Sequence, residues 1–494
     1  AAGDCGDHVL QQPVRGAIPP DERRLDRRGH PARADVLPYA TALHRRPDPR
    51  SREMTKLAFI GAGSTIFMKN IVGDLAFFEA LRDAEIALMD IDAQRLEESR
   101  NVAEKMIASM GTGATVEATT DRARALDGAD FVVTAFQIGG YRPSTVIDFD
   151  IPKQYGLRQT IADTLGVGGI MRGLRTVPHL WAVAEDMARL CPDALLLQYV
   201  NPMAINTWAL AERFPALKQA GLCHSVQNTV EEIAHDLDLP AREIRYRVAG
   251  VNHVAFFLSL EHEGRDLYPM LREGYRAGRL PKPPLLMPRC WNKVRYEVMD
   301  HLGHFCTESS EHLAEYVPWF IKDGREDLIE EFRIPLDEYP LRCVEQAEGW
   351  AEQARGLKAA SGIAVEKSHE FAAEMMNAIV TDTPYVAYAN LPNRGQVPQL
   401  PVGAAVETPT LVDGQGCQPT TVTEIPPQLV ALMRTQINVQ ELVVRALTEE
   451  NVEHIYHAAY MDPHTAAELD LRQIRSLITD LLAAHGDMLP EFAR

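Results

Sequence analysis

The chain lacks an apolar run long enough to cross a bilayer, and it lacks an excess of basic residues. A membrane-spanning helix needs about 20 consecutive apolar residues, so no such span is expected. The 494 residues include 50 Lys and Arg against 69 Asp and Glu, a formal net charge of -19. Nucleic acids and anionic membranes require a basic patch that neutralises phosphate, so neither is an expected partner. A small neutral ligand is compatible with this charge.

The cysteines lack the spacing of a disulfide framework. They are odd in number and scattered, at positions 5, 191, 223, 290, 306, 343 and 417. Free thiols of this kind are typical of a reducing compartment, which predicts a cytoplasmic protein. With 46% apolar and 24% charged residues, the composition is that of an ordinary globular protein of two or three domains.

Residues 1–53 differ in composition from the rest of the chain. They hold ten Lys or Arg and eight Asp or Glu, with repeated proline and no apolar periodicity. There is no apolar core of a secretory signal, and the acidic residues argue against a transit peptide. Met54, followed by the apolar run 57–60, resembles a natural start. We therefore expect residues 1–53 to be a disordered or non-native leader.

Short apolar runs alternate with helical stretches between residues 54 and 245. The predicted strands are Leu57–Ile60, Glu85–Asp90, Phe131–Ala135, Ala194–Val200 and Ala220–His224, and the predicted helices include Thr65–Leu81 and Gln94–Ser109. Such alternation predicts an α/β fold, with a Rossmann-like doubly wound parallel sheet that helices cover on both faces.

The alternation ends near residue 245. The later predicted strands are Val254–Glu261, Tyr385–Ala389 and Ala404–Val406, and the later helices are Glu308–Lys322, Ala364–Val380, Gln428–His454 and Thr465–Ala484. We therefore expect a second, C-terminal α+β domain over residues 246–494, with some of its last helices packing on the first domain.

A glycine-rich turn follows the first predicted strand and ends at Ser64. Gly61 would make the tight turn, and Gly63 would let the backbone approach a pyrophosphate at the helix N-terminus. The third glycine of the usual fingerprint is missing, because Ile66 stands there. Asp90 ends the second strand, where an acid would hold the ribose hydroxyls of NAD and disfavour NADP. The same aspartate could also serve only as a turn residue.

Cys223 and His253 each stand just after a predicted strand. A thiolate and an imidazole are ligands that a borderline-soft divalent metal prefers. The pair by itself more often indicates a buried structural cysteine and a hydrogen-bonded core histidine, so its context must decide.

Two polar residues lie where a doubly wound sheet binds its ligands. Asn201 ends an apolar strand with an Asn-Pro turn, and it could face a nicotinamide or a sugar hydroxyl, or only shape the turn. Asp163 begins a glycine-rich segment, 163–172, which could be an active-site lid or a plain structural loop. His485 is rejected as a catalytic residue, because Gly486 after it is explained as the end of a helix.

Glu308, His312 and Tyr316 recur at i, i+4 and i+8 on one face of the predicted helix 308–322. A polar stripe of this kind is either a solvated face or a wall of an active site. A tyrosine acts as a base when its pKa is lowered, which a nearby metal cation would do.

Together these motifs resemble glycoside hydrolase family 4, the NAD- and divalent-metal-dependent glycosidases, from about Lys56 to the C-terminus. The motifs that carry the resemblance are Gly61-Ala62-Gly63-Ser64, Gln137-Ile138-Gly139-Gly140-Tyr141, the run from Gly156 through Asp163 to Thr176, Val200-Asn201-Pro202-Met203, Cys223-His224-Ser225-Val226, Gly250-Val251-Asn252-His253 and Glu315-Tyr316-Val317-Pro318. Cys-His-Ser-Val is similar to the α-galactosidase group, which implies melibiose-like α-galactosides without phosphate. Related groups act on α-glucosides or α-uronides.

The resemblance implies a mechanism that differs from the paired-carboxylate scheme of most glycosidases. Bound NAD would oxidise C3 of the sugar, and the ketone would acidify the proton at C2. A base would remove that proton while a divalent metal, Mn²⁺ by preference, stabilises the enediolate. The aglycone would then leave C1, water would add, and the hydride would return to C3.

The resemblance also implies a role for each candidate residue. The cofactor residues are Gly61, Gly63, Ser64 and Asp90, the metal ligands are Cys223 and His253, the substrate contacts are Asp163 and Asn201, the base is Tyr316, and the acid for the leaving group is His224. The second domain would then hold substrate and metal and would form a homodimer or homotetramer.

Two other functions share the predicted nucleotide domain. A 2-hydroxy acid dehydrogenase would need a carboxylate-binding Arg with a catalytic His at the sheet edge, and the sequence shows no such pair. A non-enzymatic NAD sensor would tolerate loss of Cys223 or Tyr316 without losing its role.

Overall fold

A computed structural model describes residues 54–284, 289–359 and 362–494. The expected leader, residues 1–53, lies outside the described residues. Within the described ranges, none of the helices combines the length and the apolar character that a membrane crossing requires.

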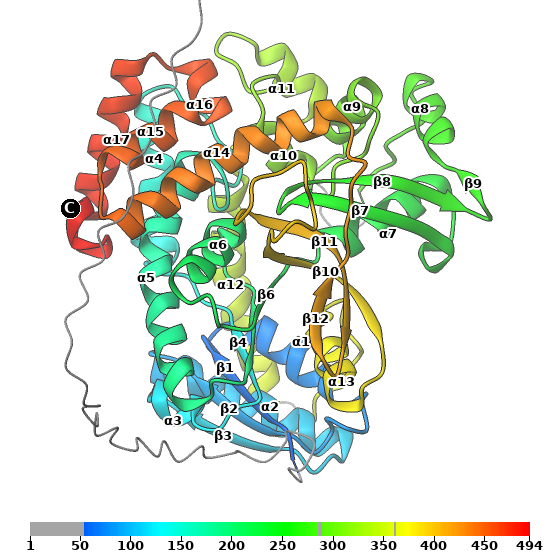
Figure 1. The fold of residues 1–494 in the computed structure, drawn as a ribbon, viewed down its shortest axis with the longest axis vertical. Coiled ribbons are helices and arrows are strands. Elements are labelled where there is room, and N and C mark those ends of the chain that lie inside the picture. Colours follow the sequence, from blue (N-terminus) through cyan, green and yellow to red (C-terminus); the bar gives the residue numbers. More distant parts are fainter. Residues whose placement is uncertain (1–53, 285–288, 360–361) are drawn as a thin grey trace, which may run out of the picture. The chain divides into compact units, whose positions relative to one another are not determined.

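A twelve-stranded sheet forms the centre of the described chain (Figure 1). Its parallel part follows the order β3-β2-β1-β4-β5-β6, which is the order of dinucleotide-binding folds. These strands are β1 (Lys56–Ile60), β2 (Glu85–Met89), β3 (Thr115–Thr119), β4 (Phe131–Thr134), β5 (Leu195–Gln198) and β6 (Gln219–Leu222). The predicted α/β class with a Rossmann-like sheet is confirmed.

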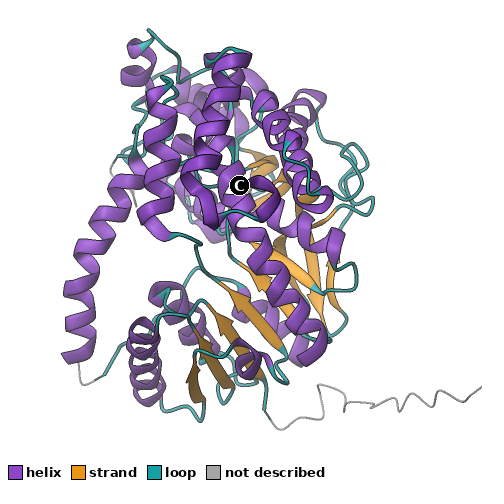
Figure 2. Ribbon diagram, turned by 90° about the vertical axis from the view of Figure 1, so that its left-hand side faces the viewer, coloured by secondary structure: helices purple, strands orange, loops and turns teal. Residues whose placement is uncertain are grey.

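The parallel strands are nearly continuous apolar runs because helices cover both of their faces. Leu57 and Phe59 of β1 face a core shared with α1 (Thr65–Leu75), α2 (Ala93–Met110) and α13 (Ala372–Thr381). Ala58 and Ile60 face the other core, shared with α3 (Arg122–Leu126), α5 (Gly166–Leu190) and α6 (Met203–Arg213). Figure 2 shows helices on both sides of the strands.

The second half of the chain extends this sheet with antiparallel strands, in the order β6-β10-β11-β7-β8-β9, while β12 pairs with β11. The added strands are β7 (Ile244–Val251), β8 (Val254–His262), β9 (Arg265–Asp266), β10 (Tyr385–Pro392), β11 (Ala405–Asp413) and β12 (Gly416–Pro419). One sheet therefore continues across residue 245, and the domain boundary drawn there stays a prediction.

The remaining helices surround these strands. They are α4 (Val146–Gln154), α7 (Ser225–Leu237), α8 (Tyr268–Arg276), α9 (Lys293–Leu302), α10 (Ser310–Tyr316), α11 (Glu326–Phe332), α12 (Glu338–Ala359), α14 (Pro427–Glu449), α15 (Glu453–Met461), α16 (Pro463–Glu468) and α17 (Leu471–His485). Helix α14 packs on α5 and α6, and α17 packs on α4, so the C-terminal helices lie against the first half of the chain.

Several expected helices have other bounds in the structure, and the expected helices 428–454 and 465–484 are each divided in two. Two differences bear on the site. The helix expected at 308–322 spans only Ser310–Tyr316, because Ser309 is extended and Pro318 cannot continue a helix. The glycine-rich segment 163–172 is neither a lid nor a loop for most of its length, because α5 begins at Gly166. A Cβ on Gly168 would stand 2.2 Å from the carbonyl oxygen of Ala162, so glycine there permits close packing.

A buried charged cluster joins α17 to α4 and α5. The Arg175 guanidinium donates to both carboxylate oxygens of Asp148, at 3.1 and 2.7 Å, and the His485 ring lies 2.8 Å from the same carboxylate. All three side chains are almost fully buried. His485 therefore has a structural place, in agreement with its rejection as a catalytic residue.

Replacing Asp148 with Ala should lower the free energy of unfolding by about 3–5 kcal/mol, because the Arg175 charge would remain buried without its partner. Asp480→Ala is the matched control, since it removes an exposed α4–α17 contact with the Tyr155 hydroxyl, and it should cost about 0.5 kcal/mol or less. Urea unfolding of both variants measures the difference, and equal losses would contradict the assignment.

Candidate active site

Three ligating side chains converge at the carboxyl edge of the sheet. The donor atoms of Cys223, His253 and Glu308 all lie within 4.8 Å of one another. Ligand atoms lie about 2.0–2.6 Å from a bound divalent ion, so atoms on one ion are at most about 4–5 Å apart. The residues therefore fit a single divalent cation with a mixed sulfur, nitrogen and oxygen donor set. Glu308 is the member that the sequence did not identify as a ligand.

The local fold explains the places of the first two ligands. Strand β6 ends at Leu222 and α7 begins at Ser225, so Cys223 lies in the short connection between them. Val251 pairs with Val254, which leaves Asn252 and His253 as the turn of the β7–β8 hairpin. His253 has a φ of 67°, a conformation that costs a non-glycine residue about 1–3 kcal/mol and concentrates at functional sites.

Glu308 reaches the cluster because the segment before it pairs with β8. Phe257 N donates to Phe305 O and Thr307 N donates to Ala255 O, both at 2.9 Å. One carboxylate oxygen of Glu308 then lies 3.2 Å from His253 Nε2, and the other lies 3.5 Å from His312 Nδ1.

The protonation states in the cluster suit a cation. Burial alone would raise the pKa of Glu308, but the imidazoles of His253 and His312 outweigh it and lower the pKa below its ordinary value. Burial lowers the pKa of His253, so its ring is neutral and can offer a lone pair. Burial raises the pKa of the Cys223 thiol, and the Glu308 and Glu407 carboxylates raise it further. Metal binding would therefore displace a proton from that thiol.

Tyr316 lies directly behind the histidine of the cluster. Its hydroxyl is 3.0 Å from His253 Nδ1, and its side chain is fully buried. Burial raises the pKa of Tyr316 well above its ordinary value. A hydrogen bond to the distal nitrogen fixes the ring orientation of a metal-binding histidine, so Tyr316 orients His253.

Asp163 and Asn201 meet beside this cluster. The Asn201 amide donates to Asp163 Oδ2 at 3.3 Å, and the Thr164 hydroxyl donates to Asp163 Oδ1 at 2.7 Å. Arg172 and His312 lie 3.7 and 3.9 Å from the same carboxylate. Burial would raise the pKa of Asp163, but the Arg172 guanidinium and the neighbouring imidazoles outweigh it and lower that pKa below its ordinary value, so the carboxyl is ionised at neutral pH.

His224 lies next to Cys223 and is partly open to solvent, with a side chain 43% exposed. Its Nδ1 is 3.7 Å from a carboxylate oxygen of Glu370, a residue that carries no motif in the sequence. The ring of Phe67, on α1, is 6.5 Å from the imidazole centroid. This aromatic contact places the cluster beside the helix that follows the glycine-rich turn.

The glycine-rich turn lies between β1 and α1, and Gly61 makes the tight turn expected of it. Gly61 has a φ of 94°, and a Cβ there would stand 2.3 Å from the Ala135 carbonyl oxygen, so only glycine fits. Gly63 N donates to Asp90 Oδ2 at 2.7 Å, and Ser64 precedes the first residue of α1. The structure thus brings all four predicted cofactor residues together at the N-terminus of a helix, where a phosphate binds favourably.

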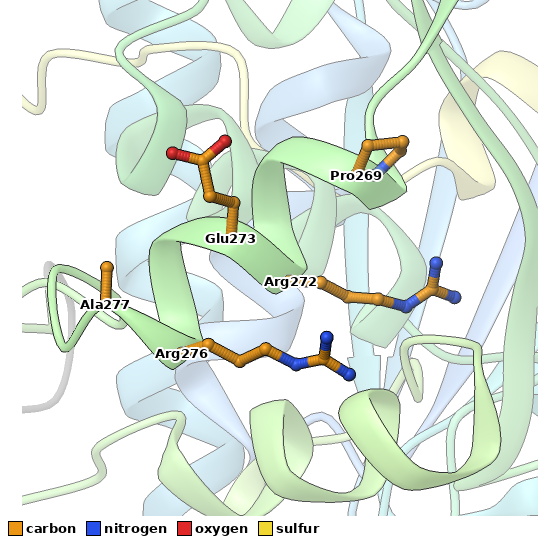
Figure 3. A pocket seen from close by; sticks show the side chains of 5 residues that line it. All are labelled: Pro269, Arg272, Glu273, Arg276 and Ala277. Atoms are coloured by element: carbon orange, nitrogen blue, oxygen red, sulfur yellow. The ribbon is translucent and has the colours of Figure 1, made fainter.

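A separate surface hollow of about 540 Å³ lies on α8 (Figure 3). Its lining residues are Pro269, Arg272, Glu273, Arg276 and Ala277. None of the site residues contributes to it, so it is not a candidate for the active site.

Loss of the Cys223 thiolate should abolish the thiolate-to-metal charge-transfer absorption that Co²⁺ would show in the wild type. Glu308→Gln should weaken Co²⁺ binding at least 10-fold, because loss even of an outer partner of a ligand costs about 10- to 100-fold. Titration of Cys223→Ser and Glu308→Gln with Co²⁺ measures both effects. Cys417→Ser, which changes a cysteine of β12, is the control and should retain the band. An unchanged band in Cys223→Ser would contradict the site.

Comparison with known proteins agrees with this geometry. The chain matches the Family 4 glycosyl hydrolase domain over residues 56–239 and the Family 4 glycosyl hydrolase C-terminal domain over residues 248–465. It is 44% identical to an alpha-galactosidase of Bacillus subtilis (strain 168), over 89% of this chain and all of that protein. An alpha-galactosidase of Rhizobium meliloti (strain 1021) is 30% identical, over 89% of this chain and 90% of that protein.

A solved structure shows the same fold. A 6-phospho-alpha-glucosidase from gut microorganisms, in complex with NAD and Mn²⁺, superposes with a TM-score of 0.74 over 89% of this chain and all of that chain, at 21% identity. With two domain matches and a relative at 44% identity over its whole length, the chain belongs to family 4 of the glycosyl hydrolases.

Proposed function

We propose that this protein is an NAD- and Mn²⁺-dependent α-galactosidase that hydrolyses melibiose-like α-galactosides. The observation that carries the proposal is the meeting of Cys223, His253 and Glu308 with Asp163 at the edge of the nucleotide sheet. The names of the two most similar relatives reported above support the sugar, and the cofactors of the structural neighbour support NAD and Mn²⁺.

The charges of the site favour a neutral sugar over a phosphorylated or uronic one. Glu308 and Asp163 are ionised, Asp163 is buried and Glu308 is partly buried, and Arg172 is already engaged with Asp163. A sugar phosphate or uronate would add negative charge beside these carboxylates, where it is disfavoured. α-Glucosides and α-galacturonides remain the alternative substrates, with the galacturonides weakened by this argument.

When bound, NAD supplies the hydride acceptor for C3 of the sugar and Mn²⁺ supplies the Lewis acid for the adjacent oxygens. Cys223, His253 and Glu308 would hold the metal, and Gly61, Gly63, Ser64 and Asp90 would hold the nucleotide. These assignments rest on the donor atoms of the three metal-binding candidates and on the glycine-rich turn that precedes α1.

The remaining residues have roles in binding and proton transfer. Asp163 and Asn201 would bind sugar hydroxyls, since their polar atoms meet beside the cluster. Tyr316 would take the proton from C2, because the positive charge of a divalent metal held by His253 would stabilise a phenolate in contact with that ring. His224, the exposed member, would protonate the leaving oxygen.

We also infer a reducing, cytoplasmic location and a homodimeric or homotetrameric state. The first is supported by the six free cysteines among the described residues. The second is supported by exposed apolar side chains such as Trp319, Leu341 and Val344. Light scattering on the purified protein measures the state of assembly.

Removal of either cofactor should abolish hydrolysis of p-nitrophenyl α-galactoside. The full assay contains NAD, Mn²⁺ and a thiol, and each component is omitted in turn, with p-nitrophenyl α-glucoside, α-galacturonide and α-galactoside 6-phosphate as alternative substrates. We expect turnover only with both cofactors, highest for the galactoside, and deuterium at C2 of the product in D₂O because that proton is removed.

Two results would overturn this proposal. Activity that survives both NAD removal and metal chelation would exclude the redox route. Accumulation of NADH in proportion to substrate would favour a dehydrogenase, since the glycosidase returns its hydride.

A further inference from the structure

A buried glutamate next to Tyr316 has backbone groups as its partners. Glu315 is 3% exposed, and no ion pair with Lys or Arg is found for it in the part of the chain that the structure describes. Its carboxylate accepts from Thr160 N and Ala162 N, each at 2.8 Å, and from Ile161 N at 3.2 and 3.3 Å. Three consecutive backbone donors therefore converge on one side chain that lies more than 150 positions away in sequence.

The 160–162 segment is held in an uncommon conformation by several further contacts. Ala162 has a φ of 52°, in the left-handed region that non-glycine residues rarely occupy. The Thr160 hydroxyl donates to the carbonyl of Glu311, on the same helix as Glu315, at 2.6 Å. The Thr160 carbonyl accepts from Tyr339 N at 3.0 Å. Gly169 packs so closely that a Cβ there would stand 2.5 Å from Thr164 backbone atoms.

The residue that follows this segment is Asp163, whose carboxylate meets Asn201, Arg172 and His312. The direction of that carboxylate is set by the backbone just before it. Glu315 sits on α10, the helix that also carries His312 and Tyr316. The three N–H bonds thus tie the Asp163 backbone to the element that supports the metal histidine.

We propose that Glu315 is a positioning residue that clamps residues 160–162 and so aims Asp163 at the sugar. The proposal deepens the proposed function, because it takes Asp163 to be the group that binds the substrate. The alternative is that Glu315 stabilises the fold without a specific effect on Asp163. The positioning role and the purely structural role predict different results. Only in the positioning role does the change in KM on replacing Glu315 depend on the Asp163 carboxylate.

Glu315→Gln keeps the size of the side chain but places an NH₂ group against backbone donors. We expect KM for p-nitrophenyl α-galactoside to rise at least about 10-fold, because buried backbone N–H groups would lose their acceptor. NAD affinity and Co²⁺ binding through Cys223 should change less than about twofold, because neither site contains Glu315. Amide hydrogen exchange of residues 160–162 should become faster.

A double-mutant cycle separates positioning from stability. If Glu315 acts through Asp163, Glu315→Gln should add little further loss in an Asp163→Asn background. Asp462→Asn is the matched control, since Asp462 is buried and accepts from Thr465 N at 2.9 Å at the start of α16. That variant should lose thermal stability and keep its kinetic constants.

The proposal would be overturned if Glu315→Gln lowered kcat/KM by the same factor in the wild type and in the Asp163→Asn variant. An unchanged KM in Glu315→Gln would also overturn it. If Glu315→Gln does not fold, Thr160→Val can take its place in the double-mutant cycle, because it removes the hydrogen bond from the Thr160 hydroxyl to α10. A wild-type protein without α-galactosidase activity would refute the proposed function instead. The hydrogen-exchange comparison would then still report on the clamp.

Discussion

Several strands of one sheet end at a common edge, and the direction of those strands decides where the site residues lie. Parallel strands place whatever follows them at their carboxyl edge. The glycine-rich turn follows β1, Asn201 follows β5 and Cys223 follows β6, so all three reach that edge. β10 and β11 then pair between β6 and β7, which brings the β7–β8 hairpin and His253 to Cys223. The candidate metal ligands therefore meet only because β10 and β11, from the second half of the chain, extend the sheet that the first half forms.

Carboxyl groups near Cys223 keep its thiol protonated, so a bound cation would change the charge state of the cluster. Glu308 is ionised, and burial raises the pKa of Glu407, on β11, to about 8. Both carboxylates disfavour a thiolate at Cys223. A buried charge is costly unless it is paired, and a divalent ion would pair with Glu308 and Cys223 together. The ionised and buried Asp163 carboxylate beside this cluster would still oppose an anionic substrate, which agrees with the proposed uncharged sugar.

The sequence predicts those parts of the site that depend on local chain geometry. Apolar strands and the turn at Gly61 follow from composition and periodicity, and the strand-end positions of Cys223 and Asn201 follow from the strands. Glu308 was noted only as part of a helical stripe, and the helix in fact begins after it. The bonds from residues 160–162 to Glu315 span more than 150 positions and leave no periodic trace. Such contacts are decided by tertiary packing, which no local pattern encodes.

The strained residues of the site suggest that its geometry is fixed before substrate arrives. His253 and Ala162 both have positive φ, at a cost of about 1–3 kcal/mol each. Such conformations persist only where several surrounding contacts hold the backbone in place. The β7–β8 ladder fixes the first, and the N–H bonds to Glu315 fix the second. From Gly166 on, the glycine segment that could have been a mobile lid is instead the start of α5. The proposed removal of a weakly acidic C2 proton would need the sugar held in register with base and metal, and a misplacement of about 1 Å can cost about 100-fold in rate. The strain is therefore located where positional error would be most harmful.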